Sequence, residues 1–256
     1  MSALAYLAAL LWIQGHAREA FETSERSLEL AGEVGGPVTL ALAWGMRCAL
    51  LVVAGMRDEL RGWLARARIH SVERNIGYWS NVCSMWSAWL QTVDGDVEGG
   101  TALLERHLDA YRASGGRIGI ASFNCLLAAV HLAAGRPRPA LEVLSAGQEH
   151  IEAAGERYFE PEIQWLMARA LMAPGAPDPA AAGAAYERAA QSAAGQGARL
   201  WELRAATGLA LLQRKAGAAS TSMSRIESLC EWFGADSALP EVRRARALLD
   251  GERAAG

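Results

Sequence analysis

The chain has 256 residues, with 25 basic and 28 acidic side chains and a formal net charge of −3 at pH 7. This balance lacks the basic excess that supplies most affinity for phosphate backbones, so direct binding to nucleic acid is not expected. The one lysine, Lys215, lies in LLQRKAG, which is not the GxxxxGK[ST] loop that holds nucleotide phosphates. The apolar stretch from Ala3 to Ile13 is shorter than the roughly 20 residues that span a bilayer, so no membrane segment is predicted.

Residues that commonly carry chemistry are scattered. The four cysteines form no CxxC or Cys/His ligand spacing, and the five histidines form no HExxH motif. Cys125 and His131 are six residues apart, which places them on different faces of a helix. The sequence therefore predicts no catalytic residue, no metal site, no cofactor and no enzymatic activity. It also predicts buried, reduced thiols and a cytoplasmic location.

Glycines recur at a fixed interval, which is the signature of a repeat protein. The first series stands at every fortieth position and consists of Gly15, Gly55, Gly95, Gly135 and Gly175. Gly217 continues it after a slightly longer interval, of forty-two positions. Halfway between them stands a second series, Gly35, Gly115, Gly155 and Gly195, with Asn75 in the missing place. Asparagine is the next-best residue for the left-handed turn that ends a helix, so both series predict helix ends.

The segments between these turns are rich in Ala, Leu, Arg and Glu and poor in alternating β-branched residues, which favours helix over strand. We expect one domain, 1–256, of paired helices. The predicted hairpins cover about 2–34, 38–74, 78–114, 118–154, 158–196 and 200–234, and a final helix covers about 239–250. Extra residues around Gly175 enlarge the turn of the fifth hairpin and explain why the last interval is longer.

A small residue stands seven positions before each glycine of the first series. These residues are Ala8, Cys48, Ala88, Ala128, Ala168 and Ala210. A small side chain at a fixed place lets the two helices of a hairpin approach closely. With Ala20 and Ala140 five positions after the turn glycine, the pattern resembles the tetratricopeptide repeat. These units are longer than that repeat, whose usual length is about 34 residues. The predicted fold is all-α, a tetratricopeptide-like α-solenoid of about six helical hairpins plus a C-terminal helix.

Longer strings carry a second resemblance. They are GERYFEPEIQWLMARALM from Gly155, AAYERAAQSAAGQGARLWELRAATGLALL from Ala184 and CEWFGADSALPEVRRARALLD from Cys230. They resemble the C-terminal repeat region of bacterial signalling ATPases that carry a class III adenylate or guanylate cyclase domain or a DNA-binding transcriptional-activator domain. The stretch from Glu73 to Arg117 is similar to the preceding repeat of that family. The family's catalytic domains have no counterpart here, so the resemblance implies a sensing or protein-interaction role.

Aromatic residues suggest where a partner would bind. Positions ten, six and three residues before the turn glycine share one face of the first helix in each hairpin, which lines the concave side of such a repeat. The candidate groove contacts on this stripe are Trp12, Met85, Trp89, Trp165 and Arg169. The alternative is that these aromatics fill the interior.

Two functions fit these observations. In the first, the chain is a non-catalytic protein-interaction and regulatory scaffold. Its partner is a protein or a peptide, and upstream domains of the same polypeptide are one such partner. In the second, the repeat array binds a small-molecule effector in its groove, and some hydrolytic activity is a less favoured part of this alternative.

The opening helix suggests a further contact. Leu4, Leu7, Leu10 and Leu11 spread more widely around this helix than one partner helix can cover. This spread predicts self-association through the N-terminal helix or contact with a preceding repeat. It leaves open whether the chain is a fragment or an independent adaptor.

Overall fold

The structure is a computed structural model that describes every residue except 176, 219 and 256, and describes the backbone alone at 252–255. The fold is all-α, a helical-hairpin repeat of the α-solenoid class, as the sequence predicts. The described residues form thirteen α-helices and one short 3-10 helix and contain no strand. None of their helices is long and apolar enough to cross a membrane. The chain divides into two compact units, 1–130 and 131–256.

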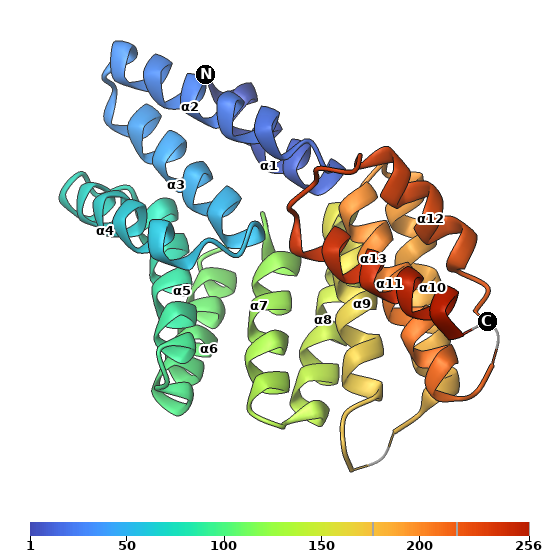
Figure 1. Cartoon of the computed structure of the whole chain (residues 1–256). Helices are drawn as coiled ribbons and strands as arrows, with labels where there is room; N and C mark the ends of the chain where they lie inside the picture. Colours follow the sequence, from blue (N-terminus) through green and yellow to red (C-terminus); the bar gives the residue numbers. More distant parts are fainter. Residues whose placement is uncertain (176, 219, 256) are drawn as a thin grey trace. The chain divides into compact units, whose positions relative to one another are not determined.

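The first unit consists of helical hairpins in chain order (Figure 1). Its helices are α1 (Ser2–Gln14), α2 (Ala17–Val34), α3 (Pro37–Val53), α4 (Arg57–Glu73), α5 (Gly77–Val93) and α6 (Val97–Ala113), followed by most of α7 (Ile120–Ala133). Within each hairpin the two helices are in contact, and α1, α3 and α5 also touch in succession. The first helix of each hairpin therefore forms an inner layer, as expected for stacked repeats.

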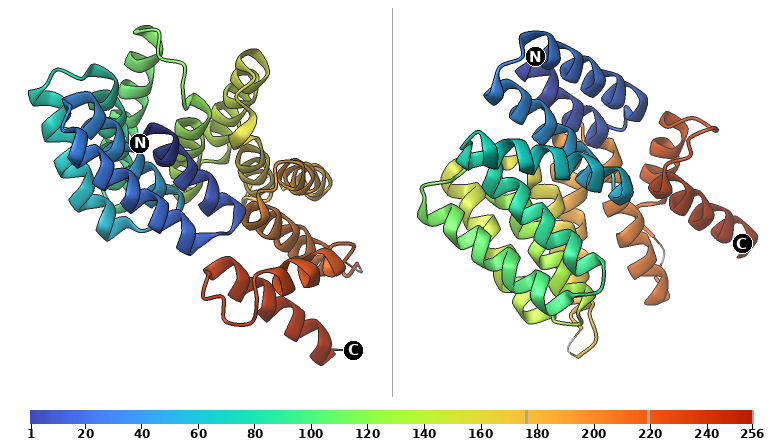
Figure 2. Two further views of the ribbon diagram at one scale, coloured as in Figure 1. Left: turned by 90° about the horizontal axis from the view of Figure 1, so that it is seen from above. Right: turned by 90° about the vertical axis from the view of Figure 1, so that its left-hand side faces the viewer.

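The second unit repeats this arrangement (Figures 1 and 2). Its helices are α8 (Pro137–Ala154), the 3-10 helix η1 (Arg157–Phe159), α9 (Glu160–Leu171), α10 (Pro179–Gly195), α11 (Arg199–Lys215), α12 (Met223–Trp232) and α13 (Pro240–Ala255). Helix α11 contacts α9 on one side and α13 on the other. The inner layer of this unit is therefore built from α9, α11 and α13.

The small positions predicted from the repeat are all buried. Each of the six is at most 3% exposed. Gly100, five residues after the turn Gly95, is equally tight, because a Cβ atom there would lie 2.8 Å from the carbonyl oxygen of Ala88. Helix pairs in this protein therefore cross at points that have no room for larger side chains.

The turns adopt the predicted left-handed conformation with one correction. The predicted turn residue Gly195 is instead the last residue of α10, and Gly197 takes the positive φ of 66°. Gly197 lies forty-two positions after Gly155, and Gly217 lies forty-two positions after Gly175. Both intervals are two positions longer than the regular repeat of forty. Both long intervals include the α9–α10 loop, so the extra residues enter there and shift every later turn by the same amount.

Asn75 provides a direct test of the turn register. Among the described residues it is the only non-glycine with a positive φ, at 54°. Because a Cβ atom is strained in this conformation, Asn75→Ala is expected to lower the free energy of unfolding by about 1 kcal/mol, whereas Asn75→Gly is expected to preserve or raise it. Urea denaturation of the two variants measures the difference. Equal stabilities would contradict a left-handed residue at this turn.

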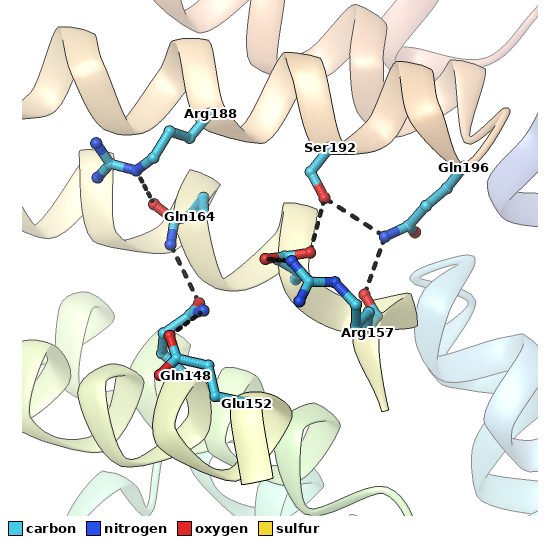
Figure 3. A network of polar contacts seen from close by, with 8 residues as sticks. Gln148, Glu152, Arg157, Gln164, Arg188, Ser192 and Gln196 are labelled. Atoms are coloured by element: carbon cyan, nitrogen blue, oxygen red, sulfur yellow. Dashed lines mark hydrogen bonds and ion pairs between the residues drawn. The ribbon is translucent and has the colours of Figure 1, made fainter. Parts of the chain in front are cut away.

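Polar side chains join three helices of the second unit (Figure 3). Gln164 of α9 donates a hydrogen bond to Gln148 of α8 at 3.2 Å and accepts one from Nε of Arg188 on α10 at 2.9 Å. Further along the same helices, Ser192 donates to Glu160 at 3.1 Å. Gln164 is largely buried, so these bonds satisfy a polar group that would otherwise be costly. They fix α9 between its two neighbours.

Candidate binding pocket of the second unit

The second unit contains a pocket of about 540 Å³. It is lined by side chains of α9, α11 and α13, by the α9-terminal Met172, and by Tyr186 from α10. The lining residues are Trp165, Arg169, Met172, Tyr186, Arg204, Thr207, Gly208, Leu211, Leu212, Lys215, Pro240, Glu241 and Arg244. We call this site the basic pocket. It opens on the inner layer of the unit, the layer that usually carries the binding surface of a helical repeat.

Helical spacing explains how α9 contributes to the pocket. Pro161 occupies the first turn, where its missing N–H costs nothing, and Glu160 and Glu162 suit the positive end of the helix dipole. The helix then presents Trp165, Arg169 and Met172 on one face. The adjacent Gln164 anchors the same helix to α8 and α10, so the face has a fixed orientation.

The lining contains four cationic side chains and one carboxylate, Glu241. Arg204 forms an ion pair with Glu162, a neighbour outside the lining. The other three cations, Arg169, Lys215 and Arg244, form no ion pair with any residue that the structure describes. The pocket is therefore positively charged, although the chain as a whole is slightly acidic.

Trp165 holds two of the guanidinium groups in place. The guanidinium carbon of Arg204 lies 4.1 Å from the Trp165 ring centroid, and that of Arg169 lies 4.7 Å from it. Both distances are within the range of cation–π attraction. The tryptophan is half-buried and also packs against buried alanines of α10 and α11. It therefore serves as a platform that orients cations around the cavity.

Tyr186 reaches the pocket because α11 has a glycine opposite it. A Cβ atom at Gly208 would lie 2.6 Å from Cε1 of the Tyr186 ring, which is closer than side chains tolerate. Glycine in the middle of a helix costs about 1 kcal/mol relative to alanine, and the close ring contact accounts for its presence. Burial raises the pKa of Tyr186, with the nearby Arg169 acting in the opposite direction. Its hydroxyl therefore stays protonated at neutral pH and is a potential hydrogen-bond donor.

A single arginine positions α13, which supplies Arg244. Arg246 donates hydrogen bonds to the carbonyl oxygens of Ala235 at 2.8 Å and Ser237 at 3.4 Å, and also to that of Gly234. These carbonyls lie in the α12–α13 connection, where a helix ends with unsatisfied acceptors. The guanidinium therefore ties the connection to the helix that follows it.

The predicted contact residues fall into two groups. Trp165 and Arg169 line the basic pocket. Trp12, Met85 and Trp89 belong to the first unit and are buried, with Met85 at 0% and both tryptophans at 9% exposure. Met85 is a core residue that presents no surface, and this corrects the expectation that it contacts a partner.

The buried tryptophans have neighbours that explain their burial. Trp12 packs edge-on against Phe21, with 5.8 Å between ring centroids, and Arg57 lies over the ring of Trp89 at 6.0 Å. Side chains of the neighbouring helices α2 and α4 therefore cover these two rings. The interior-filling alternative therefore describes these two residues.

Several pocket residues were not predicted. Extending the stripe rule to the sixth hairpin selects Thr207, Leu211 and Arg214, which are ten, six and three residues before Gly217, and the first two of these line the pocket. One turn beyond Leu211 on the same face lies Lys215. Arg244 had no such signal, because its helix follows the last turn glycine of the series and therefore holds no position counted back from such a glycine.

Within the described residues no group of three or more His, Cys, Asp or Glu side chains is placed to hold a metal ion. All four cysteines are buried, as expected, and form no disulfide bond with any residue that the structure describes. Burial raises the pKa of Cys83 to about 12, so its thiol is not ionised at neutral pH.

Comparison with known proteins does not assign the chain to a family. The chain matches no protein-family model, and none of the curated proteins is similar enough to count as a relative.

Proposed function

We propose that the chain is a non-catalytic regulatory binding module and that its ligand binds in the basic pocket. The observation that carries this proposal is a cavity of about 540 Å³ on the inner layer of the second unit, with three lining cations that form no ion pair among the described residues. Its volume lies within the range of about 300 to 1,000 Å³ that is typical of small-molecule sites. Binding across α9, α11 and α13 would couple ligand occupancy to the packing of successive hairpins.

The resemblance of the sequence to the tails of signalling ATPases supports the same role. In such proteins a repeat region acts as a sensing arm for a cyclase or a transcriptional activator. We propose that this chain works in the cytoplasm in that way, as an arm whose occupancy biases a partner domain. The pocket favours the effector-binding form of the proposal over a scaffold that recognises only proteins.

A protein partner on the exposed face of α1 is the second candidate. It is favoured by the exposed side chains of Tyr6, Leu7 and Leu10 on α1, which are 41–45% exposed and lie on the helix expected to self-associate. An apolar patch of this kind commonly marks a protein contact. Analytical ultracentrifugation of the wild type and of a Leu7→Glu, Leu10→Glu double variant would show whether this patch mediates self-association.

The pocket is tested by filling it. Met172→Trp places a larger side chain at the end of α9, within the lining, without changing charge. In a thermal-shift screen of small metabolites and of peptides from upstream domains, we expect the wild type to be stabilised by at least one compound and the variant by none. Met56→Trp is the control, because Met56 is also a partly buried methionine at a helix end but belongs to the first unit. A compound that stabilises both variants equally would place its site elsewhere.

A further inference from the structure

The basic pocket combines charge with an apolar wall, and this combination defines a ligand class. Arg169, Lys215 and Arg244 provide the charge, while Trp165, Met172, Leu211 and Leu212 provide apolar surface. Guanidinium groups bind carboxylate and phosphate oxygens through paired hydrogen bonds, and lysine binds them as a point charge. The apolar side chains are suited to a hydrocarbon or aromatic body.

Two of these cations, Arg169 and Arg244, repel each other in the absence of an anion. Desolvation by the surrounding protein lowers the pKa of Arg169, and the charge of Arg244 lowers it further, while Tyr186 acts in the opposite direction. Like charges held close together are destabilising unless an opposite charge lies between them. Glu241 is the one carboxylate in the lining and leaves an excess of positive charge. An anionic ligand would remove this repulsion on binding.

Resting on the proposed function, we propose that the basic pocket binds a small organic molecule that carries two or more negative charges on an apolar body. Arg169, Lys215 and Arg244 bind its acidic groups, and Tyr186 donates a hydrogen bond from the side of α10. Trp165 does not bind the charges itself but holds Arg169 and Arg204 in position. A concave cavity of this volume suits a small molecule better than an extended peptide, which requires a long groove.

The test is a calorimetric titration of the full chain with matched probes. Naphthyl phosphate carries a dianion on an aromatic body, naphthol carries the same body without charge, trimesate replaces phosphate by carboxylates, and inorganic phosphate lacks the body. We expect naphthyl phosphate, trimesate or both to bind at least ten-fold more tightly than naphthol and inorganic phosphate. The tighter of the two is the favoured probe, and added salt should weaken its binding because salt screens the charges.

Two variants locate the binding. Arg169→Gln and Arg244→Gln are each expected to lower the affinity for the favoured probe about ten-fold, which is the effect of losing one charge-assisted hydrogen bond. Both side chains are exposed, so neither change should unfold the chain, and circular dichroism checks this. Arg243→Gln is the matched control, because it removes one charge from α13 outside the lining and should leave affinity unchanged.

The outcomes separate this inference from the proposed function. If naphthol binds as tightly as naphthyl phosphate and Met172→Trp blocks it, the pocket remains a binding site but the charge requirement is wrong. If Arg243→Gln weakens binding as much as Arg244→Gln, the effect is general electrostatics and the site is wrong. If a short acidic peptide binds through Arg169 and Arg244 more tightly than any of the probes, the small-molecule assignment is overturned.

Discussion

Replacing Gly45 by alanine is expected to lower the free energy of unfolding by about 3 kcal/mol, the upper part of the usual range for overpacking. Gly45 is a buried residue of α3, and a Cβ atom there would overlap the six-membered ring of Trp79 on α5. Trp79 is 5% exposed, so its ring has little space into which to move. The contact joins the inner helices of two successive hairpins, and loosening it would weaken the first unit.

Gly62→Ala is the matched control for this prediction. Gly62 is exposed in the middle of α4, and no atom lies within 4 Å of the position that its Cβ would occupy. The same substitution should there raise the free energy of unfolding by up to about 1 kcal/mol, because alanine favours a helix. If the two glycines have the roles described, chemical denaturation should show a lower free energy of unfolding for Gly45→Ala and a higher one for Gly62→Ala. A stable Gly45→Ala variant would show that Trp79 does not lie against α3.

Trp165→Ala is expected to affect both binding and stability. Removing the ring takes away the platform under Arg169 and Arg204, so affinity for the pocket ligand should fall about thirty-fold, or about 2 kcal/mol. Because the tryptophan is half-buried, the loss in unfolding free energy should stay below the range of about 3 to 5 kcal/mol that is typical of a buried aromatic. Calorimetry with the tightest-binding probe measures the first quantity, and urea denaturation measures the second.

Trp232→Ala controls for the loss of a tryptophan–arginine contact. Arg199 lies over the ring of Trp232 at 4.4 Å, but neither residue lines the basic pocket. This variant should therefore leave ligand affinity unchanged. If Trp165→Ala instead costs about 3 to 5 kcal/mol of stability and leaves binding unaffected, Trp165 is a core residue and the pocket loses its main support.

The repeat pattern allowed most of the fold to be predicted. Turn residues with positive φ are limited to glycine and a few tolerant residues, so Gly15 and Asn75 reveal helix ends without reference to packing. The small positions predicted helix crossings for a similar reason, because only small side chains fit there. Gly195 shows where this reasoning failed: two glycines stand close together, and only the structure shows that the second one, Gly197, forms the turn.

The site was less predictable than the fold. The stripe rule selected Trp165 and Arg169, but it gave equal weight to Met85, whose burial depends on neighbours distant in sequence. Whether an aromatic on an inner helix is covered or open is decided by the residues opposite it. The charge of the pocket was hidden for the same reason, because Lys215 and Arg244 become neighbours of Arg169 only when α11 and α13 pack together.

The loop between α9 and α10 has a practical consequence. Its extra residues move every later turn by two positions along the chain, yet the hairpins that follow keep the same pattern of small crossings and left-handed ends. A connection that accepts additional length in this way is suited to engineering. A short epitope or a fluorescent reporter inserted directly after Gly175 would leave Asp178 in place as the N-cap of α10 and is expected to leave the helices on either side intact.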